Sequence, residues 1–250
     1  MEASVYNETF VMPAGAGDAS RTGRLLAMLE EMMETAGRNA AKLGAGMREL
    51  HAKGLTWVLA RLHVQVQAIP PAGQTIQIAT WPAGRHRLFA VREFQVKDSG
   101  GREQLRATSA WAMMKKETRR LSRLDPLLPV FSRHPERMVM DDFSPLPPLG
   151  QAGSRASYRA QAADIDINDH VNNTVYLDWA LRALSERVIP PGPLAMEAAF
   201  MGEARLGDEI LCRSERARTG DKTIVGQSLQ DAASGRELTR LRWTFRASAV

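Results

Sequence analysis

The sequence has a single cysteine, Cys212, in 250 residues, which excludes an internal disulfide and a cysteine-based zinc site. It has no uninterrupted apolar run near the ~18 residues that a membrane-spanning helix needs, so we expect a soluble protein that does not enter a membrane. The first residues lack a basic stretch followed by an apolar one, so nothing in them suggests export. Together these absences favour a reducing, cytoplasmic location.

Signatures of metals and cofactors are also missing. The five histidines have no spacing suited to metal ligation. The chain has no Gly-x-Ser-x-Gly elbow, phosphate-binding P-loop or Gly-x-Gly-x-x-Gly, so serine hydrolase, nucleotide hydrolase and dinucleotide-binding functions lack support. We therefore expect neither a metal nor a cofactor.

Positive charge is in modest excess, with 33 basic against 28 acidic residues and a pI near 9.7. Such a surface favours encounters with acidic partners. No zinc-finger spacing, arginine-rich tail or RNA-binding signature accompanies the excess, so we do not expect a nucleic-acid partner. The densest basic cluster contains Lys115, Lys116, Arg119, Arg120 and Arg123. It is either a solvated strand-to-loop transition or a docking patch.

The first half of the chain changes its hydrophobic period after a short predicted strand at 8–12. Apolar residues then recur every three or four positions over 24–43, which predicts a long amphipathic helix. Strand-like alternation follows at 57–66, 75–81, 88–96 and 104–114, with glycine-rich turns between the segments.

The second half repeats this order after a segment rich in proline. We assign residues 1–124 to an N-terminal domain, 125–153 to a linker packed over the surface, and 154–250 to a C-terminal domain. The second domain begins with a predicted strand at 156–162. A helix with an apolar stripe around Tyr176 and Trp179 comes next, followed by strands at 195–203, 209–218, 223–230 and 237–246.

The two halves superpose with one fixed offset of 134 residues. It relates Gly73 to Gly207, Ile76 to Ile210, and Gly101 to Gly235. Turns that keep register over three strands favour an internal duplication. A sheet with one apolar face must cover that face, and the helix of each half is the natural cover. The sequence thus predicts an α+β protein with a tandem, or double, hotdog fold, in which each half wraps a curved antiparallel sheet around a long helix.

Residues 164–173 are the most unusual stretch, because they place polar side chains where the second helix begins. Helix N-termini carry unpaired N–H groups and partial positive charge, which suits an oxyanion formed when water attacks an acyl carbonyl. Asn168 can donate a hydrogen bond to a carbonyl, and His170 can move protons near neutral pH. The alternative is structural, since Asp and Asn are also the preferred helix caps.

Glu203 is a second candidate, at the end of the strand predicted over 195–203. The offset of 134 places it opposite Ile69, an apolar residue. The first half has neither the asparagine nor the histidine at its strand-to-helix turn, so the polar set occurs once. This asymmetry favours one active site in the second half, with the first half kept for scaffold and acyl-chain binding. An exposed strand end is the alternative explanation of Glu203.

These residues resemble the acyl-[acyl carrier protein] thioesterases of bacterial type. The resemblance is carried by Asp166-x-Asn168-x-His170-Val171-Asn172-Asn173 with Glu203 some thirty residues later, and by Thr80-Trp81-Pro82-Ala83-Gly84 and Ala107-Thr108-Ser109-Ala110-Trp111. It implies hydrolysis of the thioester between a fatty acyl chain and the phosphopantetheine arm of acyl carrier protein, which releases a free fatty acid. Asn168, His170 and Glu203 match the family's catalytic residues, and Asp166 matches the carboxylate that positions them. Plant members have a cysteine after this glutamate, whereas this chain has Ala204, so a cysteine nucleophile is not implied.

A fatty acyl chain needs a long apolar slot. Met28 and Met32 on the first helix, together with Trp57 and Trp179, are candidates to line it, and ordinary core packing is the alternative for each. Three other functions stay open: an acyl-coenzyme A thioesterase, a double-hotdog hydratase, and a non-catalytic acyl-binding module. Hotdog proteins often pair through their sheets, so a homodimer is a further expectation.

Overall fold

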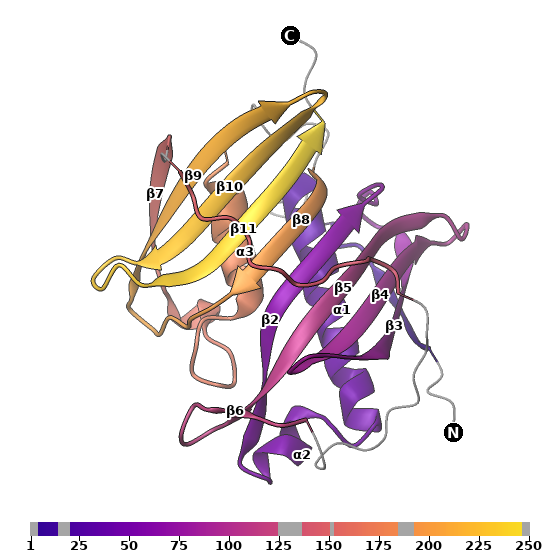
Figure 1. The fold of residues 1–250 in the computed structure, drawn as a ribbon. Helices are drawn as coiled ribbons and strands as arrows, with labels where there is room; N and C mark the ends of the chain where they lie inside the picture. Colours follow the sequence, from indigo (N-terminus) through magenta and orange to yellow (C-terminus); the bar gives the residue numbers. More distant parts are fainter. Residues whose placement is uncertain (1–4, 15–20, 125–136, 151–152, 185–192, 247–250) are drawn as a thin grey trace. The chain divides into compact units, whose positions relative to one another are not determined.

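The structure is a computed structural model that describes residues 5–14, 21–124, 137–150, 153–184 and 193–246. The chain divides into two compact units, Met1–Phe143 and Ser144–Val250. Each unit has its own antiparallel sheet and its own helix (Figure 1). Among the described residues, no helix combines the length and the apolar character that crossing a membrane requires.

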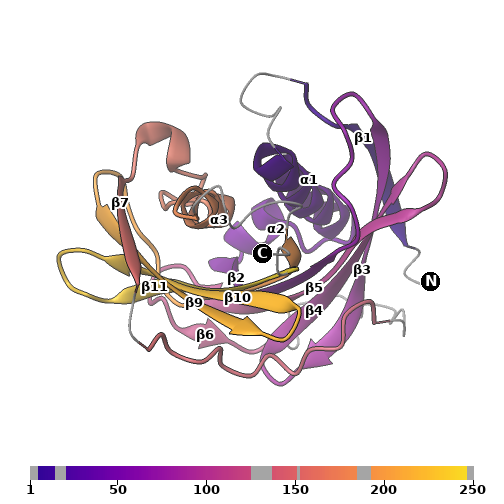
Figure 2. The ribbon, with the colours of Figure 1, turned by 90° about the horizontal axis from the view of Figure 1, so that it is seen from above.

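The first unit is a six-stranded sheet with one long and one short helix. Its elements are β1 (Tyr6–Val11), α1 (Arg21–Lys42), α2 (Met47–His51), β2 (Leu55–Val66), β3 (Thr75–His86), β4 (Phe89–Asp98), β5 (Glu103–Lys115) and β6 (Leu121–Ser122). The strand order is β1-β3-β4-β5-β2, and the short β6 pairs with β5. Helix α1 lies along one face of this sheet (Figure 2). Leu25, Met28, Leu29, Met32 and Ala36 are buried, as their three- and four-residue spacing predicts.

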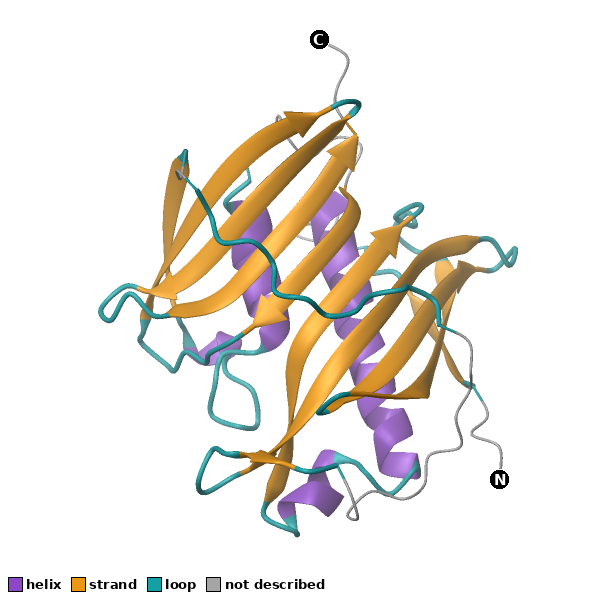
Figure 3. Cartoon of the chain, viewed as in Figure 1, coloured by secondary structure: helices purple, strands orange, loops and turns teal. Residues whose placement is uncertain are grey.

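The second unit has the same architecture with a shorter helix (Figure 3). Its elements are β7 (Ser154–Arg159), the 3-10 turn η1 (Ala162–Asp164), α3 (Asn173–Arg182), β8 (Pro193–Phe200), β9 (Glu209–Thr219), β10 (Lys222–Asp231) and β11 (Glu237–Arg246). The strand order is β7-β9-β10-β11-β8, the counterpart of the first unit. The buried Gln227 of β10 donates to the carbonyl of Ala180, which fixes α3 to its sheet (2.9 Å).

Equivalent backbone hydrogen bonds support the predicted duplication. The amides of Gln67 and Ala68 both donate to the carbonyl of Gln104, and those of Met201 and Gly202 both donate to Leu238, each 134 residues later. Gly73 and Gly207 both have a left-handed φ, of 77° and 87°, in the turns before β3 and β9. The two sheets therefore share their turns as well as their strand order.

The described part of the predicted linker, residues 137–150, has no helix or strand. The part of this segment in the first unit lies on the sheet face opposite α1. Arg92 of β4 contacts Asn39 of α1, and because side chains alternate along a strand, the next residue, Glu93, points to the other face. Glu93 pairs there with Arg137 (2.7 Å). In the second unit the amide of Gly150 donates to Glu215 (2.7 Å). Residues 125–136 and 151–152 of the predicted linker lie outside the described residues.

Three predicted features of the secondary structure are wrong in detail. The second helix is not long: α3 has ten residues against 22 in α1. The strand expected at 156–162 ends at Arg159, because η1 turns the chain toward the loop that follows. The strand expected at 195–203 ends at Phe200, since the amides of Met201 and Gly202 share one carbonyl and break the ladder. The short elements α2 and β6 were not predicted.

Candidate active site

The loop between η1 and α3 closes on itself through its backbone. The amide of Asp166 donates to the carbonyl of His170 (2.8 Å), and Ile165 and Val171 form an isolated antiparallel bridge. Asp169 has a φ of 63°, a left-handed conformation that Asp tolerates better than most residues. The predicted site residues Asp166, Asn168 and His170 are thus held in one tight turn.

Asp166 holds Asn168 from two directions. One carboxylate oxygen accepts from the Asn168 amide N–H of the backbone (2.8 Å), and the other accepts from the side-chain Nδ2 (3.4 Å). Both residues are half-buried. This arrangement orients the asparagine amide and leaves its second N–H hydrogen for another acceptor.

His170 and Glu203 come together from different parts of the second unit. His170 Nε2 lies 3.1 Å from Glu203 Oε2, and their side chains are 16% and 33% exposed. His170 precedes α3, whereas Glu203 follows β8 by three residues. The imidazole and the carboxylate are therefore within hydrogen-bond distance in a partly shielded place that solvent still reaches.

The chain around Glu203 is fixed by neighbours on both sides. The Val171 amide donates to the Ala204 carbonyl (2.9 Å), which ties this segment directly to the His170 loop. The Ala204 amide donates to the hydroxyl of Tyr176 on α3 (2.8 Å). Arg236 donates to the carbonyl of Glu203 (3.1 Å). The carboxylate thus stands on a backbone that is hydrogen-bonded to its surroundings at three points.

Tyr176 and Arg236 are contributors that sequence analysis missed. Tyr176 is 1% exposed, and burial raises the pKa of its phenol. A buried tyrosine usually needs a hydrogen-bond partner for its hydroxyl, so its place on an apolar stripe predicts such a bond. The sequence does not identify Ala204 as the partner. For Arg236 the sequence offers no signal beyond its place in a turn.

The start of α3 offers fewer amides than we expected. Asn172 is the N-cap, and its side-chain oxygen accepts from the Thr174 amide (3.1 Å). The Val175 amide donates to the Asn172 carbonyl (3.0 Å). Two of the first helical N–H groups are therefore already occupied, so stabilisation of an oxyanion would fall mainly to the Asn168 side chain.

Three of the four predicted acyl-contacting residues are buried in the cores of the units, and Trp57 is half-buried beside one of these cores. Met28 and Met32 of α1 are fully buried. Trp57 donates its indole N–H to the Ala45 carbonyl (2.9 Å) and packs beside a cluster around Leu50 and Met113. Trp179 is 2% exposed and stacks on Tyr158 with ring centroids 5.6 Å apart. Core packing accounts for all four, and their contact with an acyl chain stays a prediction.

Cys212 does not fit the role of a nucleophile. It is completely buried in β9, and burial raises the pKa of its thiol to about 11. Thiolate is the reactive form, so a buried neutral thiol is inert. Within either unit, the described residues contain no set of three His, Cys, Asp or Glu side chains whose ligand atoms lie within 4.8 Å of one another.

The fold and the pair of His170 and Glu203 define a tandem hotdog protein with one polar site at the helix start of its second half. Profiles of the acyl-ACP thioesterase N-terminal and C-terminal domains match residues 3–128 and 150–247. The chain belongs to the acyl-ACP thioesterase family.

Several named proteins share this sequence or fold. The chain is 29% identical over 206 residues to oleoyl-acyl carrier protein thioesterase 1 of Arabidopsis thaliana, covering 74% of this chain and 56% of that protein. It is 30% identical over 202 residues to a palmitoyl-acyl carrier protein thioesterase of Cuphea hookeriana, with coverages of 74% and 48%. It thus spans about half the length of these relatives. The crystal structure of an acyl-ACP thioesterase from Bacteroides thetaiotaomicron superposes with a TM-score of 0.82 at 24% identity, over 97% of this chain and 98% of that one.

Proposed function

We propose that this protein hydrolyses the thioester between a fatty acyl chain and acyl carrier protein. The observation that carries the proposal is the 3.1 Å contact between His170 and Glu203, formed in the second unit of a chain whose two halves both match the family. In the reaction, water adds to the acyl carbon, the carbon–sulfur bond breaks, and the products are a fatty acid and the phosphopantetheine thiol.

Glu203 is the general base in this proposal, with His170 as its hydrogen-bond partner. The carboxylate is one-third exposed, so a water molecule can reach it, while the imidazole is more shielded and fixes the carboxylate's orientation. The water proton passes to the carboxylate as oxygen attacks the acyl carbon. The proton then leaves with the thiol sulfur, directly or through His170, so the pair returns to its starting state.

Asn168 supplies the hydrogen bond to the carbonyl oxygen as that oxygen gains negative charge. Because Asp166 already accepts one hydrogen of the asparagine amide, the donor is oriented before the substrate arrives. Asp166 is therefore a positioning residue. Thioesters are activated acyl donors, so the reaction needs neither a metal nor a redox cofactor.

The test is hydrolysis of acyl carrier protein loaded with fatty acids of several lengths, followed by thiol release. Glu203→Ala and Asn168→Ala should each lower kcat by about a hundredfold or more, because each removes a group that acts in the transition state. Circular dichroism and a melting curve check that the variants fold. Near-wild-type turnover in either variant would remove that residue from the mechanism.

A single turnover in ¹⁸O-labelled water tests how water enters. Direct attack by water places one labelled oxygen in the fatty acid of the first turnover. If Glu203 instead attacked the carbonyl and the resulting anhydride opened at the glutamyl carbon, the first product would carry no label. A parallel assay with matched acyl-coenzyme A substrates decides between the two carriers, and faster turnover of coenzyme A thioesters would favour that alternative. The homodimer and the cytoplasmic location remain predictions.

A further inference from the structure

Two short segments of the first unit together carry a net positive charge equal to that of the whole chain. Residues 48–54 and 115–123 contain seven Lys and Arg against two Glu, a net charge of +5. The whole chain has 33 Lys and Arg against 28 Asp and Glu, which is also +5. The rest of the protein is therefore neutral overall, and the excess belongs to one place. We call these two segments the basic hairpin patch.

The fold brings the two segments together. Residues 48–54 cover α2 and the turn before β2, and residues 115–123 form the hairpin between β5 and β6. The Lys116 amide donates to the Gly54 carbonyl (2.9 Å), which joins one segment to the other. The hairpin itself is closed by the Lys115 amide donating to the Arg120 carbonyl (2.9 Å), and Arg119 adopts a left-handed φ of 54°. The cations are thus presented on a defined backbone.

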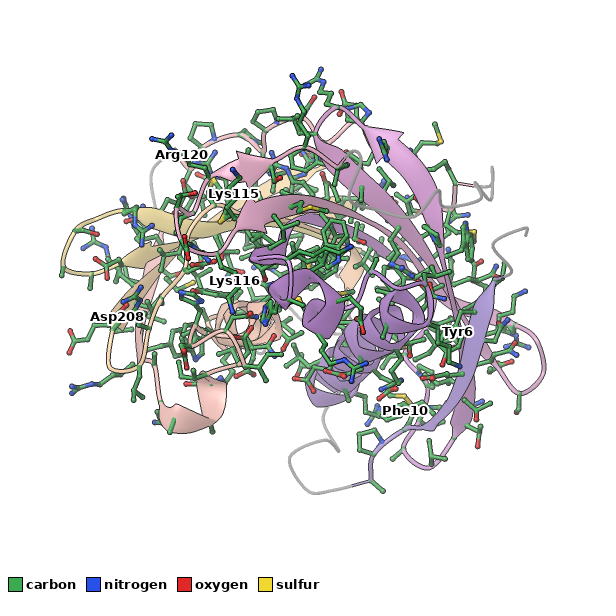
Figure 4. The ribbon with its side chains drawn as sticks, turned by 90° about the horizontal axis from the view of Figure 1, so that it is seen from below. Tyr6, Phe10, Lys115, Lys116, Arg120 and Asp208 are labelled. Carbon is green, nitrogen blue, oxygen red and sulfur yellow. The ribbon has the colours of Figure 1, made fainter. Side chains whose placement is uncertain are left out.

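Arg48 of the patch pairs with Glu49 (3.4 Å), whereas three other cations have no carboxylate partner among the described residues. Lys115, Lys116 and Arg120 are exposed and lie at the same end of the first unit (Figure 4). No carboxylate of the described residues pairs with any of these three side chains. The Lys116 ammonium instead lies 3.5 Å from His51 Nδ1, an imidazole. Like charges held close together repel, so an acidic partner that binds here relieves repulsion as well as adding attraction.

The patch also contains one large exposed apolar side chain. Leu121, which follows Arg120 in the hairpin, is 56% exposed. A single exposed leucine among cations suits the side of an amphipathic acidic helix, whereas it gives little apolar area for insertion into a membrane. The patch contains no Phe, Tyr or Trp side chain on which a nucleic acid base could stack.

We propose that the basic hairpin patch docks an acidic helix of the acyl carrier protein, with Leu121 at the centre of the contact. This inference rests on the proposed function, because the carrier is the partner that the reaction supplies. The patch would raise the local concentration of loaded carrier without taking part in the chemistry.

The experiment compares two charge-matched double variants of the full chain. Lys115→Glu/Arg120→Glu reverses two charges in the patch, and Arg216→Glu/Arg218→Glu reverses two exposed arginines on β9 of the second unit. Both change the net charge equally. The patch variant should raise KM for acyl carrier protein by about tenfold or more, with kcat kept, because charges at the rim of an interface act on association. The control variant should change this KM by less than about threefold.

Two further measurements separate failure of docking from failure of the function. Hydrolysis of an acyl-coenzyme A thioester should be equal in wild type and the patch variant, and the salt dependence seen with carrier-linked substrate should be shallower in the patch variant. If the wild-type protein hydrolysed no thioester, the proposed function would be refuted. Normal hydrolysis with an unchanged carrier KM in the patch variant would refute the docking site alone. Loss of binding to an RNA oligomer or to anionic vesicles, with carrier affinity unchanged, would assign the patch to that other partner.

Discussion

The two units share a backbone plan and differ in where they place polar groups. Ile69 in the first unit and Glu203 in the second occupy equivalent positions, because the two residues before each donate to one equivalent carbonyl, Gln104 or Leu238. One position carries an apolar residue and the other a carboxylate that contacts His170. The backbone is therefore held in the same way in both units, whether an apolar or an acidic side chain stands at this position.

The first unit has a buried charged residue on its sheet where the second unit has a glycine. Glu93 of β4 is 0% exposed, pairs with Arg137, and accepts from Thr108 (2.6 Å) and the Met138 amide (2.9 Å). Strand pairing makes Gly226 its counterpart in β10, since Thr80 pairs with Phe94 and Ser214 with Gln227, so the predicted fixed offset of 134 is one residue too long in this strand. The first unit thus uses a buried ion pair to hold residues 137–139, while the second unit places its coupled His and Glu at a partly exposed site.

The largest expected effect comes from breaking that buried pair. Arg137→Met should lower the free energy of unfolding by about 3 kcal/mol, because it leaves the Glu93 carboxylate buried without its cation. The matched control is Arg242→Met in the second unit, whose arginine pairs with Glu197 at 2.6 Å but is 41% exposed. That change should cost less than about 1 kcal/mol. Equal losses in denaturant titrations would contradict the contrast between the units.

The pH dependence of the Arg137→Met variant identifies the cause of its instability. Burial raises the pKa of Glu93 above its ordinary value of 4.5, against the hydrogen bonds from Thr108 and Met138 and the charge of Arg137, which lower it. Without Arg137 the pKa rises further. A raised carboxylate pKa costs nothing while the folded and unfolded states are both protonated and costs stability once pH rises above the unfolded value, so the variant should lose more stability than wild type as pH rises above the pKa that Glu93 has in wild type. A pH-independent loss would indicate packing instead.

The next effect tests the equivalence of Ile69 and Glu203 directly. Glu203→Ile installs the first unit's residue in the second and should lower kcat by about a hundredfold or more, with a nearly unchanged melting temperature. The reciprocal Ile69→Glu should keep kcat within about twofold, because the first unit has no His170 beside it. Activity within tenfold of wild type in Glu203→Ile would show that the asymmetry has no catalytic meaning.

A smaller effect is expected at the hydroxyl that holds the Glu203 segment. Tyr176→Phe leaves the buried Ala204 amide without its acceptor, which should cost about 1–2 kcal/mol of stability. Because Glu203 directly precedes Ala204 in the chain, kcat should fall by up to about tenfold while KM stays constant, a split that a general loss of stability does not produce. The control is Tyr158→Phe, which removes a hydroxyl from the ring that stacks on Trp179 and should leave kcat unchanged.

Local sequence patterns were enough to predict the order of helices and strands along the chain. Contacts between residues far apart in the sequence could not be predicted in this way. The offset of 134 depends on turn glycines and strand periodicity, which the sequence displays directly, and the structure confirms the duplicated sheets. Asp166 and Asn168 lie in one turn, so their pairing follows from spacing. The end of β8 at Phe200 depends on a shared carbonyl of β11, and the Tyr176–Ala204 bond depends on how α3 packs; neither has a local signature.

The smallest predicted effect concerns the stability of the two equivalent glycine turns. Gly73 and Gly207 have φ values of 77° and 87°, and a Cβ added at either would meet no atom within 4 Å. Replacement by alanine therefore costs only the left-handed backbone, about 1 kcal/mol at each site. Equal shifts in chemical denaturation for Gly73→Ala and Gly207→Ala would show that the two turns are equivalent in energy as well as in geometry. A Gly207→Ala loss well above that of Gly73→Ala would mean that this turn, which precedes β9, also supports the Glu203 segment beside it, and kcat would then fall together with stability.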